Sequence, residues 1–510
     1  MMKAGAGSCH RIFILIVAGI WMGWGQLLYA GNGQDTLAIT RGLIEKGEFD
    51  KAFTLLKEFQ SRHTSESSVA WMLAELSYWT GAYDMSDSLY QHAASLDPGN
   101  TAIRTGHANM LSQTGRLSKA SAINTEVLRQ DSENPAALLN KARIAYYRGD
   151  MQEARTAITR SLSVDPENPE ALKLKGEIGS ASSPWIFLGT DIRKDDQPLR
   201  TISPGFDAGL RHKAWLNPRF GAVLPFYQTD SSKLSAFSIY AGNEFLFTGH
   251  QLRLEVRGGI HSYPGDDRPE WTTDLLIGKK VLKHLDLSTR WQRKPYSSTV
   301  MSLKQRVIEE ALTLRARWNR PEKLNGELIF HRSAYPMDDN HITSFAGWIF
   351  VPVIATGHFT ASLGYGYSYS DAQVNKFSPI SSLEDILANS LYLEPLQGIY
   401  NPYFTPEKQY AHSALASMRY TAGKGFSIDG QVNYGFIAGS DNPYLYVDRN
   451  GSGQVYLVQA FEPTTFHPAD LKLGMSTNIS AQMSLSWEYH YSRTLYYEST
   501  TTRIYLMYRL

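Results

Sequence analysis

The chain has 510 residues, a formal net charge of +1, 12% aromatic residues and a mean hydropathy of -0.31. A chain this long exceeds one ordinary hydrophobic core, so we expect at least two domains. The balanced charge, without a basic run that could follow a phosphate backbone, argues against a nucleic-acid binder, and the low hydropathy excludes a helical membrane protein.

The N-terminus predicts a cleaved export signal over residues 1–30. Lys3 and Arg11 precede the apolar run IFILIVAGIWMGWGQLLYA, and Ala30 offers a small residue for cleavage. A retained membrane anchor is the alternative, disfavoured by the short apolar core. The only cysteine, Cys9, precedes the apolar run, so cleavage would leave neither disulfides nor a thiolate-bound metal.

A repeat of 34 residues runs through the N-terminal third. Its glycines are Gly47, Gly81, Gly115 and Gly149. A large apolar residue follows each glycine by two positions, at Phe49, Tyr83, Leu117 and Met151. A small residue follows by five positions, at Ala52, Ser86, Ala120 and Ala154. Two antiparallel helices per unit explain this spacing, because glycine forms the turn and the small residue lets the helices approach closely.

This pattern resembles the tetratricopeptide repeat (TPR) over about residues 35–168, with 169–180 as a capping helix. The predicted helical domain is therefore 35–180. The resemblance implies a concave face that binds a peptide, a partner protein or a polymer. We expect the large aromatic residues mainly to pack between helices: Trp71, Tyr78, Trp79 and Tyr146.

Beyond residue 180 the period changes from helical to two, which predicts a transmembrane antiparallel β-barrel over 184–510. In AQMSLSWEYHYS, for example, Met483, Leu485 and Trp487 alternate with Gln482 and Ser484. A soluble antiparallel sandwich also alternates, but these strands are long enough to cross a bilayer and their apolar faces end in Trp or Tyr. About sixteen strands are expected, at 185–193, 203–212, 219–228, 234–246, 251–262, 271–281, 285–294, 307–318, 324–333, 341–354, 358–370, 409–421, 426–437, 469–479, 481–492 and 501–510.

The predicted connections alternate in length. Tight links such as ATG and TAGKG follow even-numbered strands, and longer polar links follow odd-numbered ones, including very long loops over 371–408 and 438–468. This is typical of outer-membrane barrels, with both termini and the TPR domain in the periplasm. The final TTRIYLMYRL alternates to its end, as a last strand that closes a barrel must. It also resembles the terminal signal of bacterial outer-membrane proteins, with Leu510 in place of the usual Phe.

A barrel of this size leaves an aqueous channel. The polar halves of the strands supply the candidate pore-lining residues: Arg253, Glu255, Arg257, Asp274, Arg290, Arg315, Arg317, His331 and Glu488. Both signs of charge occur, which argues against a strongly charged solute. The structural alternative is that these charges only pair with one another across strands.

The order of parts resembles the outer-membrane exporters of exopolysaccharides. The type is the poly-N-acetylglucosamine export porin, with the cellulose-secretion outer-membrane subunit and the YaiO family as relatives. The resemblance implies that the barrel passes a polysaccharide and that the TPR domain docks periplasmic or inner-membrane synthase or modifying proteins, or guides the polymer. Outer-membrane lipid and the barrel-assembly machinery are further expected partners. Aromatic residues of the two long loops could contact the glycan, with the loops folded inward as a gate or outward as a cap: Tyr392, Tyr400, Tyr403, Phe404, Tyr444, Tyr446 and Tyr456.

Two other classes of function remain open. In a surface receptor or adhesin, the barrel would only display its loops. In a barrel enzyme, Glu488, His490 and Ser492 would be the candidate group, but their spacing of about 7 Å along one strand face disfavours direct hydrogen bonding. We expect no catalytic residue, no cofactor and no metal.

Overall fold

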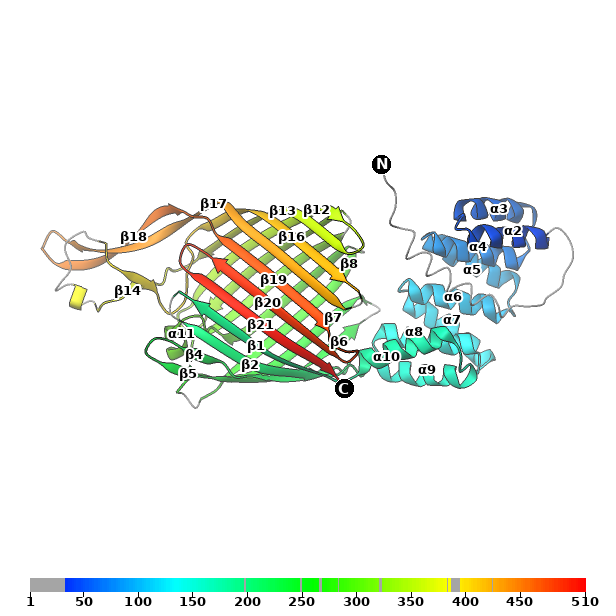
Figure 1. The fold of residues 1–510 in the computed structure, drawn as a ribbon, viewed down its shortest axis with the longest axis horizontal. Helices are drawn as coiled ribbons and strands as arrows, with labels where there is room; N and C mark the ends of the chain where they lie inside the picture. Colours follow the sequence, from blue (N-terminus) through cyan, green and yellow to red (C-terminus); the bar gives the residue numbers. More distant parts are fainter. Residues whose placement is uncertain are drawn as a thin grey trace. The chain divides into compact units, whose positions relative to one another are not determined.

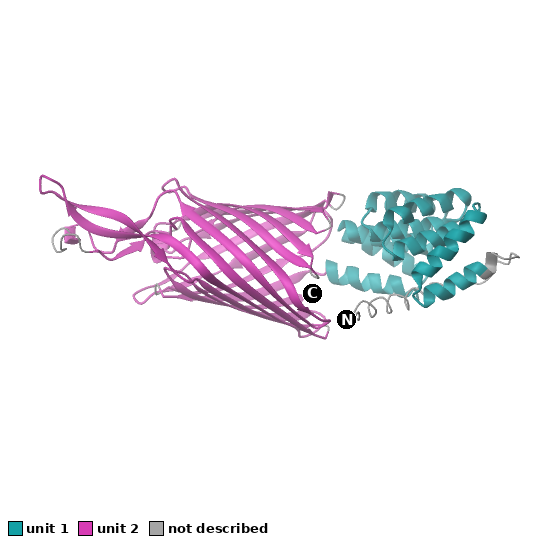
Figure 2. Ribbon diagram, turned by 90° about the horizontal axis from the view of Figure 1, so that it is seen from above, with its two compact units in different colours: residues 1–182 teal, residues 183–510 magenta. Residues whose placement is uncertain are grey.

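The computed structural model describes residues 33–196, 199–247, 250–265, 268–282, 284–320, 323–382, 384–386, 395–423 and 425–510. The predicted export signal, 1–30, lies outside these residues. The chain divides into two compact units, Met1–Ser182 and Ser183–Leu510 (Figure 2). The fold class predicted from the sequence, helical repeats followed by a β-barrel, is confirmed.

The first unit consists of antiparallel helix pairs. Its helices are α2 (Gly33–Glu45), α3 (Phe49–Arg62), α4 (Ser67–Trp79), α5 (Tyr83–Leu96), α6 (Thr101–Gln113), α7 (Leu117–Gln130), α8 (Pro135–Arg148), α9 (Met151–Val164) and α10 (Pro169–Ser182). The repeating glycine lies between the two helices of each pair in the left-handed region, as at Gly149 with φ 79°. Among the described helices, none is long and apolar enough to cross a membrane.

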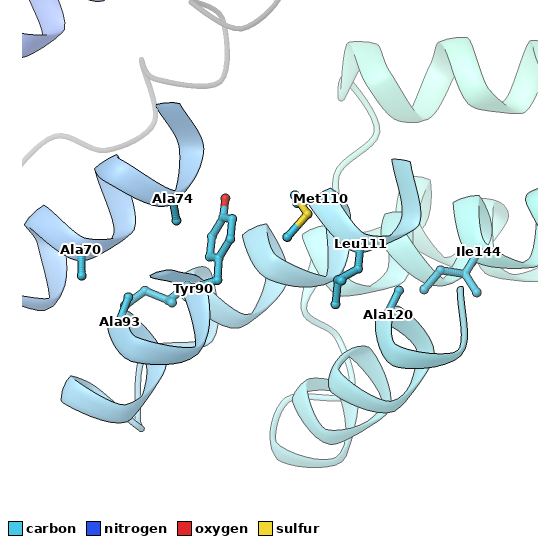
Figure 3. Close-up of a cluster of buried hydrophobic side chains, with 9 residues drawn as sticks. Ala70, Ala74, Tyr90, Ala93, Met110, Leu111, Ala120 and Ile144 are labelled. Carbon is cyan, nitrogen blue, oxygen red and sulfur yellow. The ribbon is translucent and has the colours of Figure 1, made fainter. Parts of the chain in front are cut away.

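Small residues let the helices of this unit pack closely. Ala74 and Ala120 are fully buried in a core to which α4, α5, α6, α7 and α8 contribute (Figure 3). Ser86, which replaces alanine in its repeat, is also fully buried, and its hydroxyl donates to the Ala74 carbonyl at 2.7 Å. The four aromatic residues expected to pack between helices lie partly buried against the three cores of this unit.

The second unit is a closed antiparallel barrel of sixteen strands. They are β1 (Trp185–Asp195), β2 (Arg200–Gly209), β3 (Pro218–Val223), β6 (Phe237–Phe247), β7 (Leu252–Ser262), β8 (Glu270–Leu282), β9 (Leu285–Pro295), β10 (Ile308–Arg320), β11 (Leu324–Tyr335), β12 (Asn340–Ala355), β13 (Phe359–Ala372), β16 (Gln409–Ala422), β17 (Phe426–Arg449), β19 (Ala469–Asn478), β20 (Met483–Arg493) and β21 (Glu498–Arg509). Strands β1 and β21 close the barrel, with Trp185 opposite Arg509 and Asp195 opposite Ser499. Two short strands follow β3 and precede β6 along the chain: β4 (Phe226–Gln228) pairs with β2 and with β5 (Lys233–Ser235).

The even number of strands places the start of β1 and the end of β21 on one rim, here called the terminal rim; the opposite one is the far rim (Figure 1). Connections at the terminal rim are mostly tight, such as 356–358 and 479–482. The far rim carries the long ones, 296–307 and 373–408. The predicted alternation is incomplete, because three far-rim connections, 196–199, 336–339 and 494–497, are also short.

The segment 438–468, predicted as a long loop, is instead mostly strand. β17 continues to Arg449 and returns as β18 (Val455–Thr465), a hairpin that extends beyond the barrel at the far rim (Figure 1). The alternating apolar residues on both sides of Asn450 and Gly451 carry this hairpin signal. The other predicted loop contains a short pair of its own, β14 (Phe377–Pro379) with β15 (Gly398–Tyr400).

Candidate functional site

Alternate residues of each strand face opposite sides of the barrel wall. The outer face carries exposed apolar side chains such as Leu188 (51% exposed), Ile277 (49%) and Leu363 (57%). An apolar outer surface is typical of β-barrels that span a membrane, where it contacts lipid. The opposite face, here called the lumen face, holds all nine predicted lining residues, whose role in an open passage stays a prediction: Arg253, Glu255, Arg257, Asp274, Arg290, Arg315, Arg317, His331 and Glu488.

The largest group of lumen charges joins β6, β7, β8 and β9. The Arg257 guanidinium bridges Glu255 at 3.4 Å and Asp274 at 3.3 Å. Arg290 Nε donates to Asp274 Oδ1 at 2.7 Å. With Arg253, which pairs with both Glu244 and Glu255, the group contains three arginines and three carboxylates: Arg253, Arg257, Arg290, Glu244, Glu255 and Asp274.

A second group joins β9, β10 and β11. Glu327 Oε1 accepts from Arg317 Nη2 at 3.0 Å and lies 3.1 Å from Arg315 Nε. Nearer the far rim, Glu309 Oε2 lies 3.4 Å from Lys294 Nζ. Three basic and two acidic side chains are therefore held against this part of the wall.

Smaller groups complete the lumen face. Glu488 and Asp191 flank Arg503, at 2.8 and 3.5 Å. His331 Nε2 lies 3.0 Å from the Ser333 hydroxyl and 3.9 Å from Glu309 Oε1. Single pairs of opposite charge occur elsewhere on this face: Arg193 with Asp195, Arg219 with Asp207, and Arg419 with Asp429.

Two far-rim segments, 296–307 and 395–408, meet over the mouth of the barrel and are here called the cover. The first contains α11 (Val300–Lys304), whose Thr299 hydroxyl caps the helix by accepting from the Ser302 amide. The same hydroxyl donates to the Pro402 carbonyl at 2.6 Å, joining the two segments. Leu303 is buried with Leu199 and Tyr227, which belong to the region of β1–β4. Since β6, β7 and β8 lie between β3 and β9 around the barrel, α11 bridges part of the mouth.

Three predicted glycan-contact aromatic residues instead form the packing of the cover. Tyr403 is fully buried against Tyr335 at the end of β11. Tyr400 and Phe404 pack on Tyr496 of the β20–β21 connection, with ring centroids 5.2 and 4.8 Å away. In this arrangement their rings anchor the cover.

The remaining predicted aromatics lie elsewhere. Tyr392 is outside the described residues. Tyr444, Tyr446 and Tyr456 belong to the projecting hairpin of β17 and β18, where Tyr444 and Tyr446 stack at 5.9 Å. A glycan role for these hairpin residues stays a prediction.

Several lumen aromatics, among them Tyr240, Tyr505, Trp348 and Phe350, were not among the predicted site residues. Trp348 and Phe350 lie on the lumen face of β12, with ring centroids 5.4 Å apart. Opposite them on β13 are two glycines, Gly366 and Gly364. The two-residue period places Trp348 on the same face as Ser344. The β12–β13 register then shows that the residues opposite Trp348 and Phe350 are glycines.

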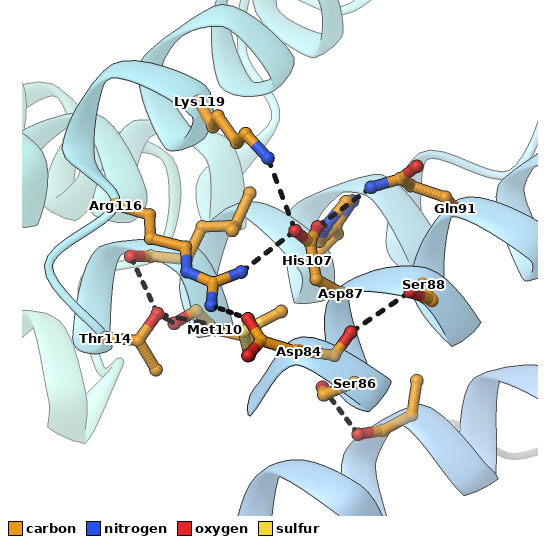
Figure 4. Close-up of polar contacts among 12 residues, drawn as sticks. Asp84, Ser86, Asp87, Ser88, Gln91, His107, Met110, Thr114, Arg116 and Lys119 are labelled. Atoms are coloured by element: carbon orange, nitrogen blue, oxygen red, sulfur yellow. Dashed lines mark hydrogen bonds and ion pairs between the residues drawn. The ribbon is translucent and has the colours of Figure 1, made fainter. Parts of the chain in front are cut away.

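In the helical unit, Arg143 joins three successive first helices of the repeats. Its Nη1 donates to Asn109 Oδ1 on α6 at 2.6 Å, and its Nη2 pairs with Glu170 on α10 at 3.1 Å. The Asn140 amide on α8 donates to the Thr105 carbonyl at 2.9 Å. A second polar cluster surrounds the buried Asp87 (Figure 4).

No family model and no curated protein matches the chain. Among solved structures, a bacterial polysaccharide outer membrane secretin is similar at TM-score 0.46 and 9% identity, covering 65% of this chain and 99% of that chain. A TPR protein with an unusual peptide-binding site covers 28% of this chain and 73% of that chain, at TM-score 0.25 and 17% identity. A thermophilic TPR protein from Thermus thermophilus covers 29% and 80%, at TM-score 0.27 and 15% identity. At these TM-scores the similarities carry no functional argument.

Proposed function

We propose that the barrel lies in the outer membrane and passes a polysaccharide chain outward, with the TPR unit in the periplasm. The observation that carries this proposal is a wide barrel with a polar lumen and a folded cover over one mouth. Sixteen strands enclose more space than their inward side chains fill. The ion pairs run between neighbouring strands, as Arg317 with Glu327 and Arg290 with Asp274, which holds these side chains against the wall. A flexible polymer would then pass through the space along the barrel axis.

The orientation follows from the connections. Outer-membrane barrels have short periplasmic turns and longer outer loops. The terminal rim, with its tight turns, would therefore face the periplasm, and the cover would face outward. The TPR unit, which precedes β1, would enter the periplasm and there dock synthase or modifying proteins or guide the polymer. Arg143, itself buried, joins α8 to α6 and α10 and so holds in place the helices that such contacts would use.

A receptor or adhesin is the second candidate, favoured by the projecting hairpin of β17 and β18. Tyr456 on this hairpin is 44% exposed. Such a role needs a stable surface projection but no conducting lumen, so the two candidates differ in whether opening the cover creates a channel.

Planar-bilayer recording of the purified full chain separates them. In one variant a short Gly-Ser linker replaces 375–407, and in a matched control a similar linker replaces 442–463 of the hairpin. We expect the first deletion alone to raise single-channel conductance severalfold. Heat-modifiable migration on gels confirms that each barrel is folded. If the cover deletion folds and stays closed, transport is overturned; loss of cell-surface attachment on hairpin deletion alone would favour the adhesin.

A further inference from the structure

We propose that the passing glycan is an uncharged one and that Trp348 is a sugar-stacking residue of the lumen wall. This inference rests on the proposed function and specifies its substrate class. It is carried by two independent observations: the charge balance of the lumen face and an uncharged arc of wall that holds paired aromatic rings.

The first observation is that the lumen charges cancel. In the described strands, the arginine and lysine ion pairs of the lumen face join ten basic side chains with ten acidic ones. A channel lined by one sign of charge concentrates solutes of the opposite sign, whereas a balanced one concentrates neither. A polyanion or polycation would also have to compete with carboxylates or guanidiniums that already have close partners, such as Glu327 between Arg315 and Arg317.

The second observation is an arc of wall without charge. The lumen-facing positions of β12 and β13 carry no charged residue: Asn340, Ile342, Ser344, Ala346, Trp348, Phe350 and Pro352 on β12, and Thr360, Ser362, Gly364, Gly366, Ser368, Ser370 and Ala372 on β13. This arc interrupts the charged wall beside β11. A chain passing here meets small polar groups and aromatic rings instead of ions.

Within this arc, Phe350 supports Trp348. A Cβ at Gly364 would lie 2.8 Å from Phe350 Cδ1, so the Phe350 ring occupies the space that the glycine leaves. Phe350 is consequently 7% exposed. Trp348 stays partly exposed, with its ring plane at 63° to that of Phe350. The indole therefore rests on a buried ring while keeping surface toward the lumen.

The neighbours of Trp348 suit a sugar. A pyranose ring has an apolar face of C–H groups, which stacks on an aromatic ring, and hydroxyls at its edge, which need hydrogen-bond partners. On β11, Glu327 is the register partner of Trp348 and is held by Arg315 and Arg317. The carboxylate and the two guanidiniums offer acceptors and donors to hydroxyls, and Glu327 offsets one of the two arginine charges.

The test measures oligosaccharide block of the cover-deleted channel, with 375–407 replaced by a linker. Three hexamers of equal length are added from the terminal-rim side: cellohexaose (uncharged), glucosamine hexamer (cationic) and galacturonate hexamer (anionic). We expect cellohexaose to block about tenfold more tightly than either charged hexamer at about 0.1 M salt, where charge interactions are still felt.

Substitutions at one position and a matched outer-face control test the aromatic part. W348A should weaken cellohexaose block about tenfold, and W348F should restore most of it, because an aromatic face remains. Trp291 pairs with the outer-face Leu312 on β10, so W291A makes the same change on the lipid side and should leave block unchanged. Heat-modifiable migration verifies folding of each variant.

The outcomes separate this inference from the proposed function. Tighter block by a charged hexamer, or undiminished cellohexaose block in folded W348A, overturns the inference while the barrel remains a glycan channel. If the cover-deleted chain folds but neither conducts nor binds any hexamer, the proposed function falls and the inference falls with it.

Discussion

Tyr403 stacks on Tyr335 with ring centroids 3.7 Å apart and planes within 8° of parallel. The two residues belong to the cover and to the end of β11, and the Tyr403 hydroxyl donates to the Asp338 carboxylate at 2.8 Å. Burial raises the pKa of the Tyr403 phenol above its usual range, and the adjoining carboxylate acts in the same direction. This neutral, fully buried ring fastens the second cover segment to the wall.

We expect Y403A to loosen the cover. Removing a buried aromatic ring costs about 3–5 kcal/mol and leaves Asp338 without this donor. In planar bilayers the variant should show brief openings absent from the unaltered protein, and Y403F, which keeps the stack, should show few. The Y444A substitution, on the projecting hairpin, serves as the control. If neither Y403A nor the unaltered protein shows channel openings, other contacts suffice to hold the cover in place.

The buried carboxylate of Asp87 should dominate the stability of the helical unit. Its oxygens lie 2.7 Å from His107 Nε2 and 3.0 Å from Arg116 Nη1, and the side chain of Gln91 also donates to it (Figure 4). Although burial alone would raise the pKa of Asp87, hydrogen bonds from His107 and Gln91 hold this pKa below its usual range. D87A leaves these donors unmatched, so we expect a loss of about 3–5 kcal/mol.

Urea titration of the full chain in detergent, followed by helical circular dichroism, measures this loss. Asp84 also pairs with Arg116 but its side chain is 94% exposed, so D84A should cost under about 1 kcal/mol. Similar midpoints for D87A and the unaltered chain would contradict the assigned role of Asp87.

The sequence predicted most of the fold because its two periods are local. Recurring glycines such as Gly149 define the helix pairs, and alternation such as that around Trp487 defines strands. The hairpin of β17 and β18 falls in the segment predicted as a long loop, 438–468, although Asn450 and Gly451 carry its turn signal.

The cover could not be predicted from local pattern. Its joining hydrogen bond links Thr299 to Pro402, which are 103 residues apart. Likewise, the surroundings of Trp348 include Gly364 and Gly366 on β13. Which residues lie opposite Trp348 depends on the strand register, which the local sequence pattern does not give. The two-residue period alone predicts which charged residues share a face of their strand. Their ion-pair partners, such as Glu244 for Arg253, follow only from the pairing of strands in the structure.

Glu75 should make the helical unit less stable as pH rises. Burial raises the pKa of its carboxyl to about 7, against the opposing hydrogen bond from Trp71. Between about pH 4.5 and 7 the unfolded chain releases this proton while the folded chain keeps it. The free energy of unfolding therefore falls with pH, by at most about 1.4 kcal/mol per pH unit, and this loss is complete above the folded pKa.

E75Q should abolish this dependence and be the more stable form at pH 8. Urea midpoints of the helical signal at pH 5, 6, 7 and 8 test the expectation, and E133Q, at an exposed position, provides the control. A parallel pH dependence in E75Q and the unaltered chain would assign the effect to another group.

Gly149 and Gly176 should respond oppositely to alanine. Gly149 caps α8 at φ 79°, where an L side chain is strained, so G149A should cost about 1–2 kcal/mol. Gly176 lies within α10, with open space where a Cβ would be, so G176A should gain about 0.5–1 kcal/mol. Urea midpoints of the helical signal report both. Destabilisation by both substitutions would show that the space beside α10 is filled.

Glu327 should set the ion selectivity of the opened lumen. Its single negative charge lies against both Arg315 and Arg317, so E327Q leaves two guanidiniums without their shared carboxylate. In the cover-deleted channel, we expect the reversal potential under a KCl gradient to shift toward anion preference, and more at low salt, because screening weakens as the Debye length grows. Glu310 lies on the opposite face of the adjacent β10 and pairs with Arg293 at 3.4 Å, so E310Q makes the same chemical change outside the lumen and should leave selectivity unchanged. A shift in E310Q without one in E327Q would reverse the assignment of inner and outer faces and remove the basis for a charge-balanced passage.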